Sequence, residues 1–170
     1  MQFTLSPLTV SEVSAAHAAY NRCFDWLTAK GVRQWLLRLD DAAYAKRQAA
    51  DEAFAIQVDG VLAGCVFVPF ETIRYYGDEL NTMPHSWMHT LVIDRAFAGR
   101  GIGEQAVAAV CNLVRTRGGD SVWLHCVDDP NRVEVMPAFY ARLGFDEVMR
   151  TEVTYPSGKA FAMVVMRRAL

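Results

Sequence analysis

Apolar residues near the start of the chain recur at the spacing of helices. The pattern predicts a short strand at residues 3–5, then a helix that Thr9 or Ser11 caps and Gly31 ends. The apolar face of this helix consists of Val13, Ala16, Tyr20, Phe24 and Leu27. A second helix is predicted at residues 41–50, with Asp40 or Asp41 as its cap.

The pattern then changes to that of strands. Two apolar runs, residues 54–58 and 61–70, flank the dipeptide Asp59-Gly60, which is a strong hairpin signal. The second run can continue to Tyr75, and a further strand is predicted from about residue 85 to residue 93. The pattern therefore changes from helices to strands about a third of the way along the chain.

The remaining elements alternate between helix and strand before a closing hairpin. They are a helix that opens at residues 99–103 and ends at Gly118-Gly119, a strand at 122–127, a helix at 133–143, and hairpin strands at 145–154 and 161–167. The order is β-α-α-β-β-β-α-β-α-β-β. Because only the middle has β-α-β alternation, the fold class is a mixed α/β (α+β) sheet with helices on its faces.

Composition narrows the function classes. A chain of 170 residues with 52% hydrophobic and 21% charged residues is typical of one soluble globular domain, and we place no domain boundary. It lacks both an apolar run of about 20 residues and a signal peptide, so a cytoplasmic protein without membrane contact is expected. A net charge of −2 argues against a nucleic-acid partner. The four cysteines contain no C-x-x-C pair and are interpreted as buried thiols.

A glycine-rich turn between a strand and a helix carries the chemistry. Gly99, Gly101 and Gly103 let the backbone approach a ligand closely, and the first N–H groups of the helix point at any anion there. Arg95 and Arg100 add positive charge. The loop is neither the dinucleotide fingerprint nor a phosphate-binding P-loop, which ends in Gly-Lys followed by Ser or Thr. A tight turn without a ligand is the alternative.

Two segments together resemble the GNAT N-acetyltransferase superfamily. Residues 89–103 (HTLVIDRAFAGRGIG) resemble its acetyl-CoA-binding segment, and residues 139–145 (FYARLGF) resemble its Tyr-x-x-x-Gly-Phe element. The resemblance covers residues 1–170 as a single domain. It implies a GNAT-like, mostly antiparallel central sheet of about seven strands flanked by about four helices, and acetyl-CoA as the co-substrate.

The resemblance also implies which residues contact acetyl-CoA. These are Leu91, Val92, Ile93, Ala98, Gly99, Arg100, Gly101, Ile102, Gly103, Glu104, Asn131 and Tyr140. Backbone N–H groups would supply most of the phosphate contacts. Two positions depart from the family: Ala98 replaces its usual Gln or Arg, and Val133 stands where its asparagine commonly lies, which makes Asn131 the nearest candidate.

The same resemblance implies catalytic roles. Tyr140 would protonate the departing thiolate of coenzyme A, with a packing aromatic as the alternative. His89 is the first candidate for the base, because strand alternation places it with Leu91 and Ile93 and because an imidazole titrates near neutral pH. Glu71 is the second candidate for the base.

The identity of the acceptor stays open. A small-molecule amine is favoured, followed by a peptide N-terminus or a lysine. An acyl-CoA sensor without turnover and a nicotinamide-dependent oxidoreductase are the competing classes. No metal is expected, since His85 and His89 would lie about 13 Å apart on one strand. A monomer and a homodimer are both compatible with the sequence.

Overall fold

A computed structural model describes residues 1–32, 34–35, 38–70, 85–128, 135–154 and 160–170. They form two compact units. The first contains Met1–Pro69 and Met88–Val110, and the second contains Phe70–Trp87 and Cys111–Leu170. Within the described ranges, no helix has both the length and the hydrophobicity that crossing a bilayer requires.

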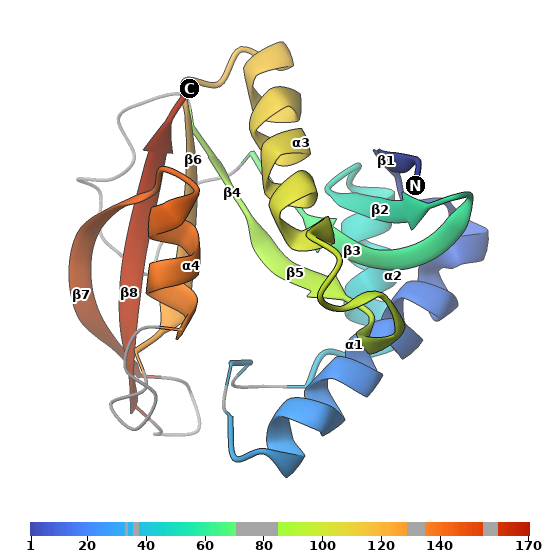
Figure 1. The fold of residues 1–170 in the computed structure, drawn as a ribbon, viewed down its shortest axis with the longest axis horizontal. Coiled ribbons are helices and arrows are strands. Elements are labelled where there is room, and N and C mark those ends of the chain that lie inside the picture. Colours follow the sequence, from blue (N-terminus) through green and yellow to red (C-terminus); the bar gives the residue numbers. More distant parts are fainter. Residues whose placement is uncertain (33, 36–37, 71–84, 129–134, 155–159) are drawn as a thin grey trace. The chain divides into compact units, whose positions relative to one another are not determined.

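The first unit is built on an antiparallel sheet with the strand order β1-β2-β3-β5 (Figure 1). Its strands are β1 (Phe3–Pro7), β2 (Ala53–Val58), β3 (Val61–Phe67) and β5 (His89–Ile93). Asp59 (φ 51°) and Gly60 (φ 77°) join β2 to β3, and positive φ at both residues is what the favoured two-residue hairpin turn requires. The hairpin predicted from Asp59-Gly60 is confirmed.

Helices α1 (Val13–Ala29) and α2 (Asp41–Ala49) pack their apolar side chains on one face of this sheet. A 3-10 turn, η1 (Val10–Glu12), precedes α1. Asp40 caps α2 by accepting a hydrogen bond from the Ala43 amide at 2.8 Å, as predicted. The shared core consists of Leu8, Val13, Ala16, Ala19, Tyr20, Cys23, Tyr44, Ala53, Ala55, Cys65, Phe67 and Val92.

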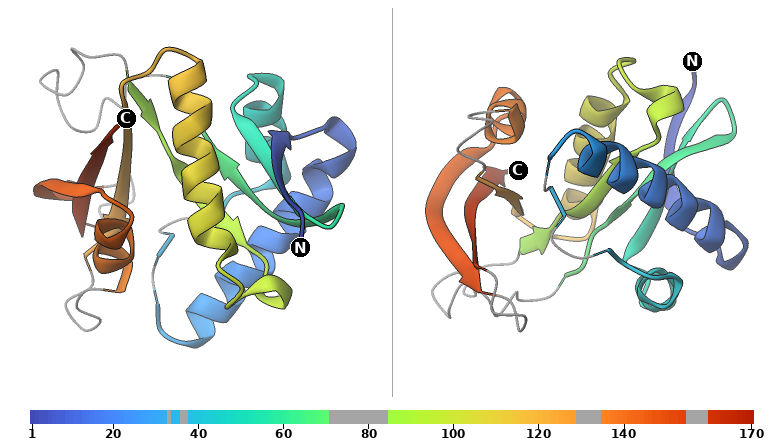
Figure 2. Two further views of the ribbon diagram at one scale, coloured as in Figure 1. Left: turned by 45° about the horizontal axis from the view of Figure 1, so that its top comes forward. Right: turned by 90° about the horizontal axis from the view of Figure 1, so that it is seen from below.

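Helix α3 (Ile102–Thr116) begins inside the glycine-rich segment, as predicted. An additional 3-10 turn, η4 (Arg95–Phe97), separates β5 from this segment. The helix buries an apolar face that contains Ile102, Ala106, Val107, Val110, Cys111 and Val114. Figure 2 shows the first turns of α3 and helix α2 on opposite sides of the first sheet.

The second unit contains a sheet with the order β4-β6-β8-β7, in which only β4 runs parallel to its neighbour. Its elements are β4 (His85–Trp87), β6 (Ser121–Val127), α4 (Val135–Arg142), β7 (Asp146–Thr154) and β8 (Ala160–Ala169). Trp87, Trp123 and Val165 form its buried cluster, with Met149 against it. The predicted closing hairpin corresponds to β7 and β8.

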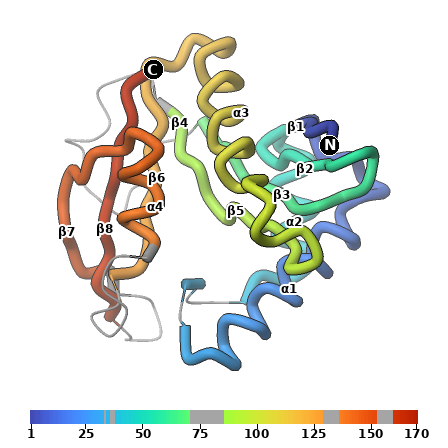
Figure 3. The backbone as a smooth tube through the Cα atoms, viewed as in Figure 1, coloured from blue at the N-terminus to red at the C-terminus, as the bar shows by residue number. Residues whose placement is uncertain are grey.

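The strand predicted over residues 85–93 is two strands. The backbone passes directly from β4 into β5 (Figure 3), but β4 pairs with β6 in one sheet and β5 pairs with β3 in the other. The described residues contain eight strands, close to the predicted number of about seven, and these strands form two mostly antiparallel sheets. The pattern along residues 85–93 could not reveal the change of partner, because β3 and β6 lie in distant parts of the sequence.

His125, on β6, should make the stability of the fold depend on pH. Burial lowers the pKa of its imidazole from 6.5 to about 4. Between these values the unfolded chain binds a proton that the folded chain rejects, so stability falls as the pH falls through this window. The loss reaches roughly 3 kcal/mol only below about pH 4, where the folded chain is protonated as well.

Urea unfolding at pH 7, 5.5 and 4.5 checks this expectation. His125→Phe keeps an aromatic ring and removes the titration, so its free energy of unfolding should fall less steeply with acid than that of the wild type. Equal slopes for the two proteins would assign the acid sensitivity to other groups.

Candidate active site

The loop between η4 and α3 has the backbone of a ligand cradle. Gly99 (φ 75°) and Gly101 (φ 70°) both lie in the left-handed region that favours glycine. A Cβ atom built on either glycine would meet no protein atom within 4 Å. The backbone therefore faces open space at both positions, as it must where a ligand approaches it closely.

The start of α3 supplies the donors for such a ligand. The Gln105 amide bonds the Gly101 carbonyl (3.2 Å), whereas helix geometry leaves the earlier amides of Ile102, Gly103 and Glu104 without an intrahelical acceptor. These N–H groups and the positive end of the helix dipole suit an anion. Arg100 belongs to the same loop, and its guanidinium lies 5.6 Å from the Phe97 ring centre. The predicted cradle residues are thus brought together in one turn.

Strand β5 has an irregular backbone next to His89. Thr90 has a φ of 50°, which is unusual for a β-branched residue. Cys65 pairs with Val92 and Phe67 pairs with His89, so β5 contains one more residue than β3 over this stretch, a β-bulge. Backbone strain of this kind costs on the order of 1–3 kcal/mol and clusters at functional sites.

The bulge corrects the prediction that His89 shares a face with Leu91 and Ile93. Residues that pair directly across antiparallel strands point to the same face. His89, opposite Phe67, therefore lies on the face of Val92 that packs against α1 and α2, while Ile93, opposite Gly64, lies on the other face. An extra residue inverts the alternation, and the sequence pattern does not show it.

Within the described chain, β5 has a strand partner along one edge only, since it is the last strand of its sheet. The Val92 side chain is part of the core, so only its main chain can face a ligand. Gly64 is a residue that the sequence did not single out here: a Cβ on it would lie 2.0 Å from the Val92 carbonyl oxygen. The close pairing of β3 and β5 depends on this glycine.

Tyr140 lies in α4, in the second unit, and is 6% exposed. Its ring makes edge contacts with Phe139 (5.1 Å between centres) and Phe145 (5.7 Å). Burial, followed by the nearby Cys126 thiol, raises the pKa of its hydroxyl. The phenol thus keeps its proton at neutral pH and can act as a donor.

The predicted site is divided between the units. The cradle, β5 and His89 belong to the first unit, and Tyr140 belongs to the second. Glu71 and Asn131 lie outside the described residues. Among the described residues there is no group of three or more side chains arranged to hold a metal ion. The four cysteines are free and buried, as predicted, and burial raises the pKa of each thiol.

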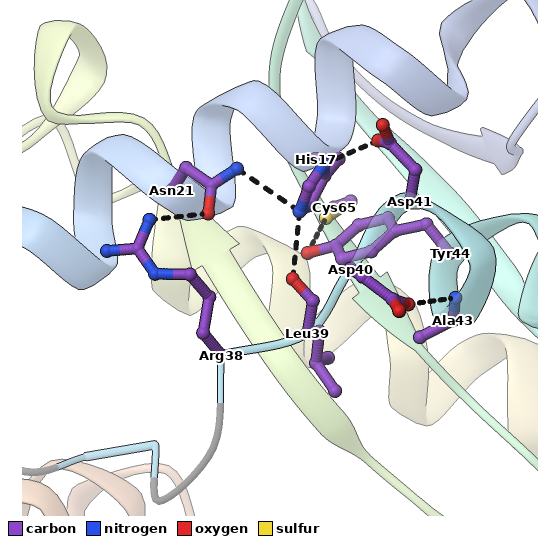
Figure 4. Close-up of polar contacts among 9 residues, drawn as sticks. All are labelled: His17, Asn21, Arg38, Leu39, Asp40, Asp41, Ala43, Tyr44 and Cys65. Atoms are coloured by element: carbon purple, nitrogen blue, oxygen red, sulfur yellow. Dashed lines mark hydrogen bonds and ion pairs between the residues drawn. The ribbon is translucent and has the colours of Figure 1, made fainter.

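A polar network joins α1 to the residues immediately before and at the start of α2 (Figure 4). His17 Nδ1 lies 2.5 Å from Asp41 Oδ1, and its Nε2 lies 2.9 Å from the Leu39 carbonyl oxygen. His17 Nε2 also lies 3.1 Å from Asn21 Nδ2. The Leu39 amide donates to Tyr20 Oη (3.2 Å). These contacts join segments about 20 residues apart and were not predicted from the sequence.

The chain matches the model of the acetyltransferase (GNAT) family over residues 14–145. It is 30% identical over 129 residues to glucosamine 6-phosphate N-acetyltransferase 1 of Oryza sativa subsp. japonica, a match that spans 76% of this chain and 63% of the rice protein. A GNAT-family acetyltransferase structure from Listeria monocytogenes superposes with a TM-score of 0.80 at 18% identity, covering 99% of this chain and 95% of that one.

The Salmonella typhimurium protein yncA, solved with its cofactor acetyl-CoA, superposes with a TM-score of 0.70 at 15% identity, covering 100% of this chain and 95% of that one. These structural likenesses confirm the mixed α/β fold class. The family match spans both the cradle and the Tyr140 element. The chain belongs to the GNAT family of acetyltransferases.

Proposed function

We propose that both units form a single domain, residues 1–170, that transfers the acetyl group of acetyl-CoA to the primary amine of a small molecule. The observation that carries this proposal is the cradle at the start of α3, where Gly99 and Gly101 leave open space in front of amides that favour an anion. The pyrophosphate of acetyl-CoA suits residues 98–104. The pantetheine arm suits the backbone of Leu91, Val92 and Ile93 at the edge of β5.

The reaction needs three groups from the chain: a donor that stabilises the carbonyl oxygen, an acid for the thiolate and a base for the amine. The amine nitrogen attacks the thioester carbonyl, a C–N bond forms, the C–S bond breaks, and the thiolate of coenzyme A leaves. A backbone N–H of β5 would stabilise the charge that develops on the carbonyl oxygen, a contribution typically worth about 3 kcal/mol. Tyr140, held as a neutral phenol, would protonate the thiolate.

His89 is the proposed base, and Glu71 is the alternative. His89 lies on the sheet face that carries α1 and α2, whereas α3 lies beyond the other face. We therefore expect the amine to approach β5 from the sheet face of His89. The thioester would be held from the opposite face, where α3 lies. Asn131 is retained as a proposed contact of coenzyme A, on the resemblance alone.

Calorimetric titration with acetyl-CoA, followed by a thiol-release assay over a panel of amines, tests the function. The panel contains glucosamine 6-phosphate, since the rice relative is named for it, together with amino acids, polyamines and peptides with free N-termini. We expect binding of acetyl-CoA and thiol release with a small amine. Binding of acetyl-CoA without thiol release for any amine favours a sensor. Thiol release with peptides alone changes the proposed acceptor from a small molecule to a peptide. Binding of NAD in place of acetyl-CoA rejects the proposal.

The pH profile of the active enzyme separates the two bases. If His89 is the base, His89→Gln should lower the rate and flatten its acidic limb, because glutamine keeps a hydrogen bond and cannot accept the proton. Glu71→Gln is the matched comparison. If the acidic limb of the pH profile disappears only in Glu71→Gln, the Glu71 carboxylate is the base. A limb that persists in both variants leaves the amine to lose its proton to bulk water.

A further inference from the structure

Side chains of helix α1 bond to the segment that connects β5 to η4. Arg22 donates to Asp94 Oδ2 from both Nε (3.0 Å) and a terminal nitrogen (2.5 Å). One residue further along the helix, Cys23 Sγ donates to the Ile93 carbonyl oxygen (3.2 Å). Consecutive residues of α1 therefore hold consecutive residues of the chain that continues into the cradle.

A third contact follows one helical turn later. The Arg95 guanidinium lies 3.9 Å from the centre of the Trp26 ring, a cation–π contact with a half-exposed tryptophan. Residues four apart on a helix lie on the same face, so Arg22 and Trp26 reach the turn from one side of α1. Helix α1 thus contacts three successive residues, Ile93, Asp94 and Arg95.

Asp94 connects helix α1 to the η4 turn through its own hydrogen bonds. Its other carboxylate oxygen, Oδ1, accepts from the Ala96 amide (3.1 Å), and its carbonyl oxygen accepts from the Phe97 amide (2.8 Å). The Asp94 side chain is 12% exposed, so its charge needs partners. Burial works against the charged form, yet the hydrogen bonds from Arg22 and Ala96 outweigh it and hold the pKa of the carboxyl below its ordinary value.

We propose that Arg22, acting through Asp94, positions the acetyl-CoA cradle. The inference rests on the proposed binding of acetyl-CoA at residues 98–104, and it assigns positioning roles to two residues outside that loop. Asp94 caps η4, η4 ends at Phe97, and Ala98 connects it to Gly99. A change in the direction of η4 therefore moves the cradle amides relative to a ligand held along β5.

Arg22→Gln and Asp94→Asn test the proposal from the two ends. Arg22→Gln leaves the buried carboxylate without its cation, and Asp94→Asn keeps an oxygen for the Ala96 amide but removes the charge. Each change should raise the Kd and the KM for acetyl-CoA about tenfold, the scale of a coupled contact, and the double variant should add little beyond either one. The turnover number at saturating acetyl-CoA should change less than twofold, because no reacting atom is involved. Arg22→Lys should restore part of the affinity.

Arg47→Gln is the matched control, since it breaks an ion pair of similar length (2.5 Å, to Glu52) between α2 and the chain before β2. It should lower stability without changing the Kd for acetyl-CoA. Hydrogen exchange of the free protein supplies a readout that needs no ligand. Amides 96–98 should exchange faster in Arg22→Gln and in Asp94→Asn than in the wild type or in Arg47→Gln.

The outcomes separate this inference from the proposed function. A wild-type protein that binds no acetyl-CoA rejects the proposed function, and the exchange rates of amides 96–98 still decide whether Arg22 and Asp94 hold the turn. Faster exchange with an unchanged Kd would overturn the positioning role. Unchanged exchange in both variants would overturn it as well, as would a loss of turnover at saturating acetyl-CoA with an unchanged KM.

Discussion

Gly101→Val is expected to weaken acetyl-CoA binding about a hundredfold or more, a loss of about 2.7 kcal/mol in binding free energy. The substituted side chain would project into the open space before the first amides of α3, where the pyrophosphate is proposed to lie. It would meet no protein atom at its Cβ, so the damage should fall on the ligand. Isothermal titration with acetyl-CoA measures the effect.

Backbone strain must be separated from this steric effect, because a side chain at a φ of 70° costs roughly 1–2 kcal/mol. Gly60→Val is the matched control: Gly60 has a φ of 77° and equally open surroundings, but it lies in the β2–β3 turn. Both variants should lose stability, and only Gly101→Val should lose affinity. A Gly101→Val protein that folds and binds acetyl-CoA as the wild type does would place the pyrophosphate elsewhere.

Tyr140→Phe should lower the turnover number about a hundredfold while changing the Kd for acetyl-CoA less than twofold. Phenylalanine keeps the edge contacts with Phe139 and Phe145 and removes only the hydroxyl. Because burial raises the pKa of that hydroxyl, the wild-type rate should show no alkaline limb from Tyr140 near neutral pH. Single-turnover kinetics measure the chemical step free of product release.

Tyr44→Phe is the control for the loss of a buried hydroxyl. Tyr44 is fully buried in the first unit, where its hydroxyl accepts from Cys65 Sγ (3.7 Å). Its removal should cost stability and leave the single-turnover rate unchanged. An equal rate in Tyr140→Phe and the wild type would make Tyr140 a packing residue and leave the thiolate to be protonated by solvent.

Local signals in the sequence predicted most elements well. The Asp59-Gly60 turn, the Asp40 cap and the glycines before α3 each work through the backbone of a few neighbouring residues. The cradle could be predicted for the same reason, since Gly99 and Gly101 must supply positive φ wherever the chain around them folds.

The strand before the cradle could not be predicted in detail. Its division into β4 and β5 depends on which strands pair with it, and these strands come from distant parts of the sequence. The extra residue at Thr90 reversed the face predicted for His89, because a bulge is a property of the register between two strands. A pattern along one strand carries no information about that register.

The sequence by itself determined the fold class, the hairpin, the helix that starts at the glycines and the family, since each is written in short-range spacing or in adjoining motifs. Only the tertiary structure decided the face of His89, the close approach at Gly64 and the pairing of Arg22 with Asp94, which lie 72 residues apart. The physical reason is that hydrogen bonds and steric contacts between distant segments depend on how those segments pack. The periodicity that predicts an element does not specify its partners.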